Sequence, residues 1–126
     1  MTAPKRGAVV AVIGASPKPN RYAYRAFEML REYGHSPVPV NPAYAEILGD
    51  RCYPHIRDVP HKIDTITLYL GKRRSDHLIN EVVSSRPRRI IMNPGAENPE
   101  LARRAAAEAI EVVEGCTLVM LRTGTF

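Results

Sequence analysis

The sequence predicts an α/β protein in which helices cover both faces of a parallel sheet. Short apolar runs alternate along the chain with segments in which apolar residues recur at helical spacing, a pattern typical of consecutive strand–helix units. The first run, Ala8 to Ile13, contains no polar residue and is rich in valine, as expected for a strand buried on both faces. A chain of 126 residues is long enough for one such domain and too short for two. We therefore expect a single domain over residues 1–126.

The first helix and the second strand follow directly. The helix is predicted by apolar residues at helical spacing: Ala23, Ala26, Phe27 and Leu30. Asn20 stands at the position of its N-cap, and Gly34 at that of a C-cap. The second strand, Pro37 to Val40, contains two prolines two positions apart, so their missing amides fall on one side. It should lie near the sheet edge, beside a short strand around Cys52 and Tyr53.

Further strands and helices complete the expected order. The strands are Asp64 to Leu70, Arg89 to Met92 and Glu111 to Glu114. One helix, capped by Ser75 or Asp76, carries an apolar face made of Leu78, Ile79, Val82 and Val83. The next helix opens with Asn98 as its N-cap and Pro99 at its first position, and the C-terminal tail forms a short helix. Right-handed crossovers then favour a doubly wound, three-layer α/β/α Rossmann-like sheet of order 3-2-1-4-5-6, with a vestigial third strand.

Composition narrows the class of protein. The formal charge of +5 suits an anionic ligand, and no apolar run reaches the roughly 18–20 residues of a membrane span. Lys5 and Arg6 precede an apolar run, as in a signal peptide. Cleavage there would remove the best strand and its glycine turn, so we expect a cytoplasmic protein. Cys52 and Cys116 lie far apart without a CxxC or His/Cys cluster, which favours reduced structural cysteines over a disulfide or a metal site.

Ligands of such sheets bind beyond the carboxyl ends of the strands, near the point where the strand order reverses. This rule selects the loops at residues 14–20, 41–45, 70–75 and 93–98. In the first loop, GASPKPNR, a glycine turn is followed by small residues and a helix N-terminus, a combination that favours phosphate. Lys18 and Arg21 add positive charge. We predict a phosphate-binding loop here; the alternative is a plain turn before a capped helix.

A nicotinamide dinucleotide is the first ligand to test against this loop. Its fingerprint, G-x-G-x-x-G followed by an acidic residue at the end of the second strand, is incomplete. Gly14 is the one glycine present, and Asn41 and Pro42 stand where the acid belongs. These absences count against NAD, although asparagine can hydrogen-bond a ribose.

The placement of the basic residues adds a second argument. Those that follow strand ends, and so face the ligand, are Lys18, Arg21, Lys72, Arg73 and Arg74. Those that precede strands, where we expect solvent or a partner, are Lys5, Arg6, Arg86, Arg88 and Arg89. The ligand-facing edge therefore suits a molecule with more phosphate than NAD. Tyr22, Tyr24 and Tyr44 stand near enough to stack on a base, with ordinary packing as the simpler role.

Several motifs resemble those of a known family. They are the GAS-x-x-x-NR loop, the VNP that ends the second strand, the NPGAE turn and the EGCT near the C-terminus. With the residues around them, which cover nearly the whole chain, they resemble the small stand-alone CoA-binding proteins of bacteria and archaea. Their domain is similar to the N-terminal CoA-binding domain of the succinyl-CoA synthetase α subunit. The resemblance implies a Rossmann domain that binds coenzyme A, whose 3′-phosphate ADP would account for the extra positive charge.

The loops and the resemblance together predict the CoA-binding residues: Gly14, Ala15, Ser16, Lys18, Asn20, Arg21, Tyr22, Asn41, Pro42, Leu70, Lys72, Met92, Asn93 and Pro94. The resemblance implies that residues 16–21 hold the diphosphate and that residues 70–72 lie by the adenine or the pantetheine. The synthetase also has domains with a phosphorylated histidine and a nucleotide-grasp fold, for which this chain has no room. Its histidines match no such motif, so synthetase activity is not carried over.

We therefore expect a binding module for CoA or acyl-CoA, acting as a carrier, sensor or accessory module without catalytic machinery of its own. No catalytic triad or paired-carboxylate arrangement emerges, and Cys116 is the one nucleophile left open. The alternative is an enzyme: an NAD(P)-binding oxidoreductase fragment, or an acyl-CoA synthetase or transferase subunit completed by another chain. Nucleic acid is disfavoured because a recognition helix and aromatic platforms are missing, and no membrane partner is expected. A homo-oligomer or a partner subunit stays open.

Overall fold

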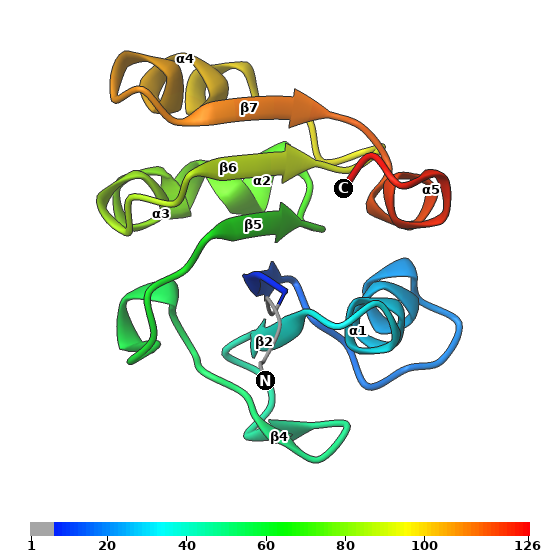
Figure 1. The fold of residues 1–126 in the computed structure, drawn as a ribbon. Helices are drawn as coiled ribbons and strands as arrows, with labels where there is room; N and C mark the ends of the chain where they lie inside the picture. Colours follow the sequence, from blue (N-terminus) through cyan, green and yellow to red (C-terminus); the bar gives the residue numbers. More distant parts are fainter. Residues whose placement is uncertain (1–6) are drawn as a thin grey trace.

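A computed structural model describes residues 7–126 and shows a parallel sheet between two layers of helices (Figure 1). Five strands are paired in the order β2-β1-β5-β6-β7: β1 (Val9–Ile13), β2 (Ser36–Val40), β5 (Thr65–Leu68), β6 (Arg89–Met92) and β7 (Glu111–Glu114). Helices α1 (Tyr22–Glu32) and α5 (Thr117–Thr123) cover one face, and α3 (Ile79–Ser84) and α4 (Pro99–Ala107) cover the other (Figure 1). The predicted α/β class is confirmed. Lys5 and Arg6 lie outside the described residues.

The vestigial third strand is a single parallel bridge between Val40 and Tyr53. The amide of Tyr53 donates to the carbonyl of Pro39 (3.0 Å), and the amide of Asn41 donates to the carbonyl of Tyr53 (2.9 Å). With this bridge the sheet has the predicted order 3-2-1-4-5-6. The two prolines of β2 therefore face the side where little pairing occurs, because they have no amide to donate.

Between Val40 and β5 the chain forms small elements that the sequence pattern did not predict. They are an antiparallel pair, β3 (Glu46–Ile47) and β4 (Asp50–Arg51), and a 3-10 turn, η1 (Ile56–Asp58). An ion pair between Arg31 and Asp50 (2.6 Å) ties the β3–β4 hairpin to α1.

Alternation along β1 explains why the sheet is covered on both faces. Ala11 and Ile13 pack into the core under α3 and α4, whereas Val10 and Val12 pack into the core under α1 and α5. Both cores are aliphatic, with Phe27 as the one large aromatic side chain fully buried among the described residues. None of the helices in residues 7–126 combines the length and apolar character needed to cross a bilayer.

Two of the predicted helix N-caps are wrong and one is confirmed. At the other end of α1, Gly34 (φ +88°) directly follows the C-cap residue Tyr33. Helix α1 begins after Arg21 without a capping side chain, and Asn20 is exposed. Helical structure after β5 starts at Lys72 in α2 (Lys72–Ser75), continuing through η2 (Asp76–Leu78), so neither Ser75 nor Asp76 caps it. Gly71 serves as the N-cap of α2, because the chain turns into a helix sooner than the apolar pattern indicated.

The confirmed cap is Asn98, whose side-chain oxygen accepts from the amide of Leu101 (3.1 Å) at the start of α4. The amide group of the same side chain donates to Ser75 Oγ (2.7 Å) and to Asp76 Oδ1 (3.0 Å). Ser75 and Asp76 thus hold the neighbouring helix instead of capping their own.

The expectation that Arg89 is solvated is wrong. The residue is only 5% exposed, and its guanidinium donates to Thr65 Oγ1 (3.3 Å) and to the Phe126 carbonyl (3.3 Å). The guanidinium also stacks on the Phe126 ring, 4.5 Å from its centroid. The cause is the tail, which returns over the amino edge of the sheet and covers this arginine.

At the same edge, Arg88 donates to both carboxylate oxygens of Asp64 (3.1 and 3.2 Å). Partial burial on its own would raise the pKa of Asp64, but hydrogen bonds from Arg88 and Thr65 outweigh it and hold the pKa below its ordinary value of 3.8. A depressed folded-state pKa means that the carboxylate stabilises the fold above about pH 4, and that this contribution is lost as pH falls through the folded pKa.

We expect Asp64→Asn to lower the free energy of unfolding by about 1 kcal/mol at pH 7, because a charge-assisted bidentate pair that solvent partly screens is lost. The deficit should shrink as pH falls below about 4 and disappear once the pH lies below the folded-state pKa of Asp64. Urea unfolding at several pH values measures it, with the exposed Asp58→Asn as the matched control. A deficit that is equal at pH 3 and pH 7 would contradict the assignment to the ionised carboxylate.

Candidate functional site

The site begins at Gly14, where β1 ends and the chain turns sharply. Gly14 has a φ of +89°, and a Cβ added there would lie 3.0 Å from Leu70 Cδ2 and 3.1 Å from the Tyr69 carbonyl group. The first loop and the segment after β5 are therefore in direct backbone contact, which only glycine allows. Two loops that are far apart in the sequence become the walls of one site.

Asn41 joins the first loop to the segment after β2. Its side-chain amide donates to the Ala15 carbonyl (2.8 Å), and its side-chain oxygen accepts from the Ala43 amide (2.8 Å). The carbonyl of Asn41 accepts from the Cys52 thiol (3.4 Å). Burial raises the pKa of that thiol, against a smaller opposite effect of this hydrogen bond, so Cys52 stays a protonated donor.

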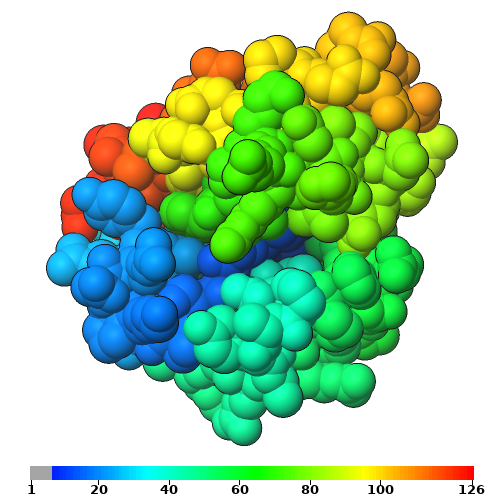
Figure 2. Space-filling model, turned by 180° about the vertical axis from the view of Figure 1, so that it is seen from behind, coloured from blue at the N-terminus to red at the C-terminus, as the bar shows by residue number. Residues whose placement is uncertain are grey.

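These loops enclose a cleft of about 780 Å³ at the carboxyl edge of the sheet. Its lining comes from the first loop and the start of α1 (residues 14–16, 18 and 20–23), from the segment after β2 (residues 41, 43 and 44), and from the segments after β5 and β6 (residues 69, 70, 74 and 94–96). In Figure 2 the blue residues of the first loop are visible in a hollow between the green segment after β5 and the turquoise segment after β2. The cleft lies where a doubly wound sheet binds ligands.

A second cavity of about 390 Å³ opens beside the cleft and is mainly apolar. Its walls come from Ile13, Val40, Pro42, Pro54, Ile56, Leu70, Leu78 and Val82, with His55, His77, Arg74 and Glu81 among them. The two cavities share Gly14, Asn41, Ala43, Leu70 and Arg74 in their linings. The two cavities therefore adjoin along these residues and give the site a polar end at the start of α1 and an apolar end against α3.

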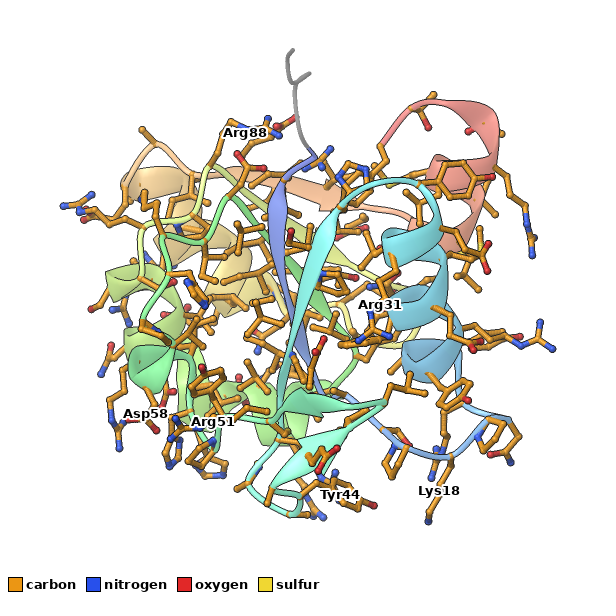
Figure 3. All side chains as sticks on the ribbon, turned by 60° about the horizontal axis from the view of Figure 1, so that its bottom comes forward. Lys18, Arg31, Tyr44, Arg51, Asp58 and Arg88 are labelled. Atoms are coloured by element: carbon orange, nitrogen blue, oxygen red, sulfur yellow. The ribbon has the colours of Figure 1, made fainter. Side chains whose placement is uncertain are left out.

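Several cations of the cleft have no acidic partner. Lys18, Arg21 and Arg74 make no ion pair with any residue of the described chain, whereas Lys72 pairs with Asp76 (2.9 Å). Figure 3 places Lys18 and Tyr44 at one end of the sheet and Arg88 at the opposite end. The unpaired charges therefore border the cleft, and the start of α1 adds amides without a capping side chain. Both features favour an anion.

The floor of the cleft rests on a buried polar cluster. Asn93 donates to Thr67 Oγ1 (2.8 Å) and to the Leu68 carbonyl (3.0 Å), and accepts from the amide of Thr117 (2.9 Å). Thr67 and Thr117 also share a hydroxyl–hydroxyl bond of 2.8 Å. Burial raises the pKa of Tyr69 beside them to about 12, against the opposing effect of these hydroxyls. Tyr69 thus remains a neutral wall of the cleft.

Most of the predicted site residues come together in this site. Those that line neither cavity are Lys72, Met92 and Asn93. Lys72 is turned to Asp76, while Met92 and Asn93 are only 0% and 2% exposed because their side chains build the core and the polar cluster. Met92 and Asn93 thus support the cleft from below, whereas other side chains form its surface.

The predicted list missed other lining residues. Among them are Tyr69, Arg74, Gly95, Ala96 and the histidines His55 and His77. Tyr44, expected only as a residue near enough to stack on a base, also lines the cleft. Arg74 follows β5, the fourth strand of the predicted order, and its charge placed it among the basic residues of the ligand-facing edge. No feature of the sequence pointed to His55, because this residue lies in a long connection whose path depends on the fold.

The profile of a known family, described as a CoA binding domain, matches residues 8–122. The chain belongs to the CoA binding domain family. The resemblance that the GAS, VNP, NPGAE and EGCT motifs predicted is thereby confirmed. The cleft of this CoA binding domain lies at the carboxyl edge of the sheet, where doubly wound sheets in general bind their ligands.

Among its relatives, acetate–CoA ligase [ADP-forming] I of Archaeoglobus fulgidus is 43% identical over 56 residues, which are 44% of this chain and 8% of the ligase. The α subunit of acetate–CoA ligase [ADP-forming] II of Pyrococcus furiosus is 34% identical over 65 residues, 51% of this chain and 14% of the subunit. The CoA binding domain thus corresponds to a small part of each ligase. A crystal structure of an uncharacterized protein superposes with a TM-score of 0.90 at 41% identity, covering 97% of this chain and all of that one.

Proposed function

We propose that this CoA binding domain holds coenzyme A or acyl-CoA as a carrier, sensor or accessory module. The diphosphate lies in the cleft at the start of α1, and the adenine ring lies in the apolar cavity. The observation that carries the proposal is the continuity of the two cavities, because a nucleotide has one polar end and one flat, weakly polar end joined by a ribose.

The polar end supports a diphosphate in two ways. The first turn of α1 has no capping side chain. The Tyr24 amide donates to the Arg21 carbonyl (3.1 Å), which leaves the amides of Tyr22 and Ala23 for an anion. Lys18 and Arg21 border the same cleft without an acidic partner among the described residues. Charge-assisted hydrogen bonds from such groups to phosphate oxygens are stronger than neutral ones.

The apolar end supports a heteroaromatic base. Aliphatic and proline side chains form most of its walls, and a few polar groups at its rim are typical of sites that orient a ring. The glycine that separates the ends, Gly14, lets the backbone come close to the ligand.

NAD fits the first loop less well, for a reason beyond the missing glycines. In nicotinamide-binding sites an acidic side chain after the second strand bonds the ribose hydroxyls. Here both polar atoms of the Asn41 side chain are engaged with Ala15 and Ala43. The residue serves to join two loops and is not free to replace the acid.

A role as an accessory module is supported by the comparison with the ligases. The matched regions make up 8% and 14% of the two acetate–CoA ligases, so most of each ligase lies outside the part that resembles this chain. We propose that any reaction of the bound acyl-CoA uses catalytic groups from outside residues 7–126.

Titration calorimetry with CoA, ADP and NAD tests this proposal. We expect saturable binding of CoA, weaker binding of ADP and no measurable binding of NAD. Arg21→Glu should weaken CoA binding by about tenfold or more, because it places a like charge beside the diphosphate. Arg25→Glu, one turn further along the same exposed helix face and outside the cleft, is the matched control. Equal effects of the two variants, or no binding of CoA, would contradict the proposal.

A further inference from the structure

We infer that Arg74 reads a phosphate group on the ribose of the bound nucleotide, so that the site selects a ribose-phosphorylated nucleotide over its unphosphorylated analogue. The inference rests on the proposed function, since it takes the diphosphate to lie in the cleft and the base in the apolar cavity.

The position of Arg74 follows from the two linings. A ribose connects base and diphosphate, so it must lie over the residues that both cavities share. Those residues are Gly14, Asn41, Ala43, Leu70 and Arg74. Arg74 is the charged residue among them. The hydroxyl positions of the ribose therefore come next to a guanidinium.

The charge of Arg74 is available, while its neighbours are engaged. Lys72 pairs with Asp76 at 2.9 Å. Glu81, the carboxylate that lines the apolar cavity, lies 3.4 Å from the guanidinium of Arg57 and 3.6 Å from His55 Nδ1. Within residues 7–126, Arg74 has no carboxylate within ion-pair distance and is exposed to solvent.

Helix geometry makes Arg74 distinct from the arginine next to it. Its amide donates to the Gly71 carbonyl (3.0 Å), which fixes it in the first turn of α2. Successive residues of a helix point about 100° apart, and Arg73 accordingly lines neither cavity. Two adjacent arginines of equal charge thus differ in whether they face the site.

The chemistry of the guanidinium matches a phosphate monoester. Its planar fork can donate two parallel hydrogen bonds to two phosphate oxygens. A ribose hydroxyl offers the fork a single uncharged oxygen, whereas a phosphate offers several charged ones. Arg74 therefore distinguishes a phosphorylated ribose from an unphosphorylated one. Two common nucleotides carry such a phosphate: CoA at the 3′ position and NADP at the 2′ position.

The test measures dissociation constants of CoA, dephospho-CoA, NADP and NAD for the native chain, Arg74→Gln and Arg73→Gln. We expect the native chain to bind CoA about tenfold or more tightly than dephospho-CoA, since a charge-assisted hydrogen bond is worth about that factor. Arg74→Gln should remove most of this preference and leave dephospho-CoA within about twofold of its native affinity. Arg73→Gln should retain the preference, which excludes a general effect of net charge.

The outcomes separate this inference from the proposed function. Equal binding of CoA and dephospho-CoA by the native chain overturns the role of Arg74 while leaving CoA binding intact. An Arg74→Gln variant that weakens both ligands alike also overturns it. Absence of CoA binding overturns the proposed function. A preference for NADP over NAD that Arg74→Gln removes would support the reading of a ribose phosphate and overturn the choice of CoA as its source.

Discussion

Replacing Gly14 by alanine is expected to lower the free energy of unfolding by about 2–4 kcal/mol and to remove CoA binding. Two costs add at this position. A φ of +89° is unfavourable for any residue with a Cβ, and the new methyl group would lie 3.0–3.1 Å from Leu70 and from the Tyr69 backbone. Backbone cannot move aside as a flexible side chain can, so the first loop must shift away from the segment after β5.

Loss of binding follows from the same shift. The cleft and the apolar cavity meet at Gly14, so separating the two walls breaks the continuity of the site. Urea unfolding measures the stability, and calorimetry with CoA measures the binding at a temperature where the variant remains folded.

Gly49→Ala is the matched control. Gly49 also has a positive φ, +85°, but its added Cβ would meet nothing within 4 Å. Only the backbone cost of about 1–2 kcal/mol should appear there, with CoA affinity unchanged. If the two variants lose equal stability and both bind CoA, the close approach at Gly14 is not what shapes the site.

Replacing Asn93 by alanine is expected to cost about 2–4 kcal/mol of unfolding free energy. The substitution removes three hydrogen bonds in a site that is 2% exposed, and it leaves the Thr117 amide without its partner. Thr67 keeps its bond to the Thr117 hydroxyl, and the Leu68 carbonyl keeps the longer bond from the Asn93 backbone amide (3.4 Å). Each buried polar group left unpaired carries a desolvation cost of about 1–3 kcal/mol. Helix α5 begins at Thr117, so its attachment to the sheet should loosen first.

The exposed Asn80→Ala is the control for Asn93. Its side chain accepts one hydrogen bond, from Arg104 (2.7 Å), at the surface, so the cost should stay below about 1 kcal/mol. Hydrogen exchange should show that amides of α5 open more readily in Asn93→Ala than in the native chain. An unchanged stability would mean that the cluster beneath the cleft does not hold α5.

The same experiment decides the role of a residue that was predicted to contact CoA. If Asn93 acts from beneath the floor of the cleft, CoA affinity of the folded variant should change by less than about threefold while its stability falls. A large loss of affinity in a chain of native stability would instead place Asn93 in contact with the ligand.

Local sequence was sufficient to predict the strands of the main sheet and the position of the first loop of the site. Apolar runs mark each strand because a parallel strand is buried on both faces, and this holds whatever its neighbours are. The turn at Gly14 and the cap at Asn98 depend on residues close in sequence, so both could be read directly. The basic residues after strand ends likewise indicated the edge of the sheet at which the cleft lies.

What the tertiary structure decided were the roles that depend on contacts between distant segments. Whether Arg89 is solvated depends on the path of the tail, and whether Asn93 faces a ligand or the core depends on where α5 begins. The same holds for Arg74 and Arg73, whose identical chemistry gives no hint of which one borders both cavities. Side-chain type and spacing determine which element forms and at which edge a charge lies. The direction in which that charge points is set by packing against segments far away in the chain, and so only the folded structure contains it.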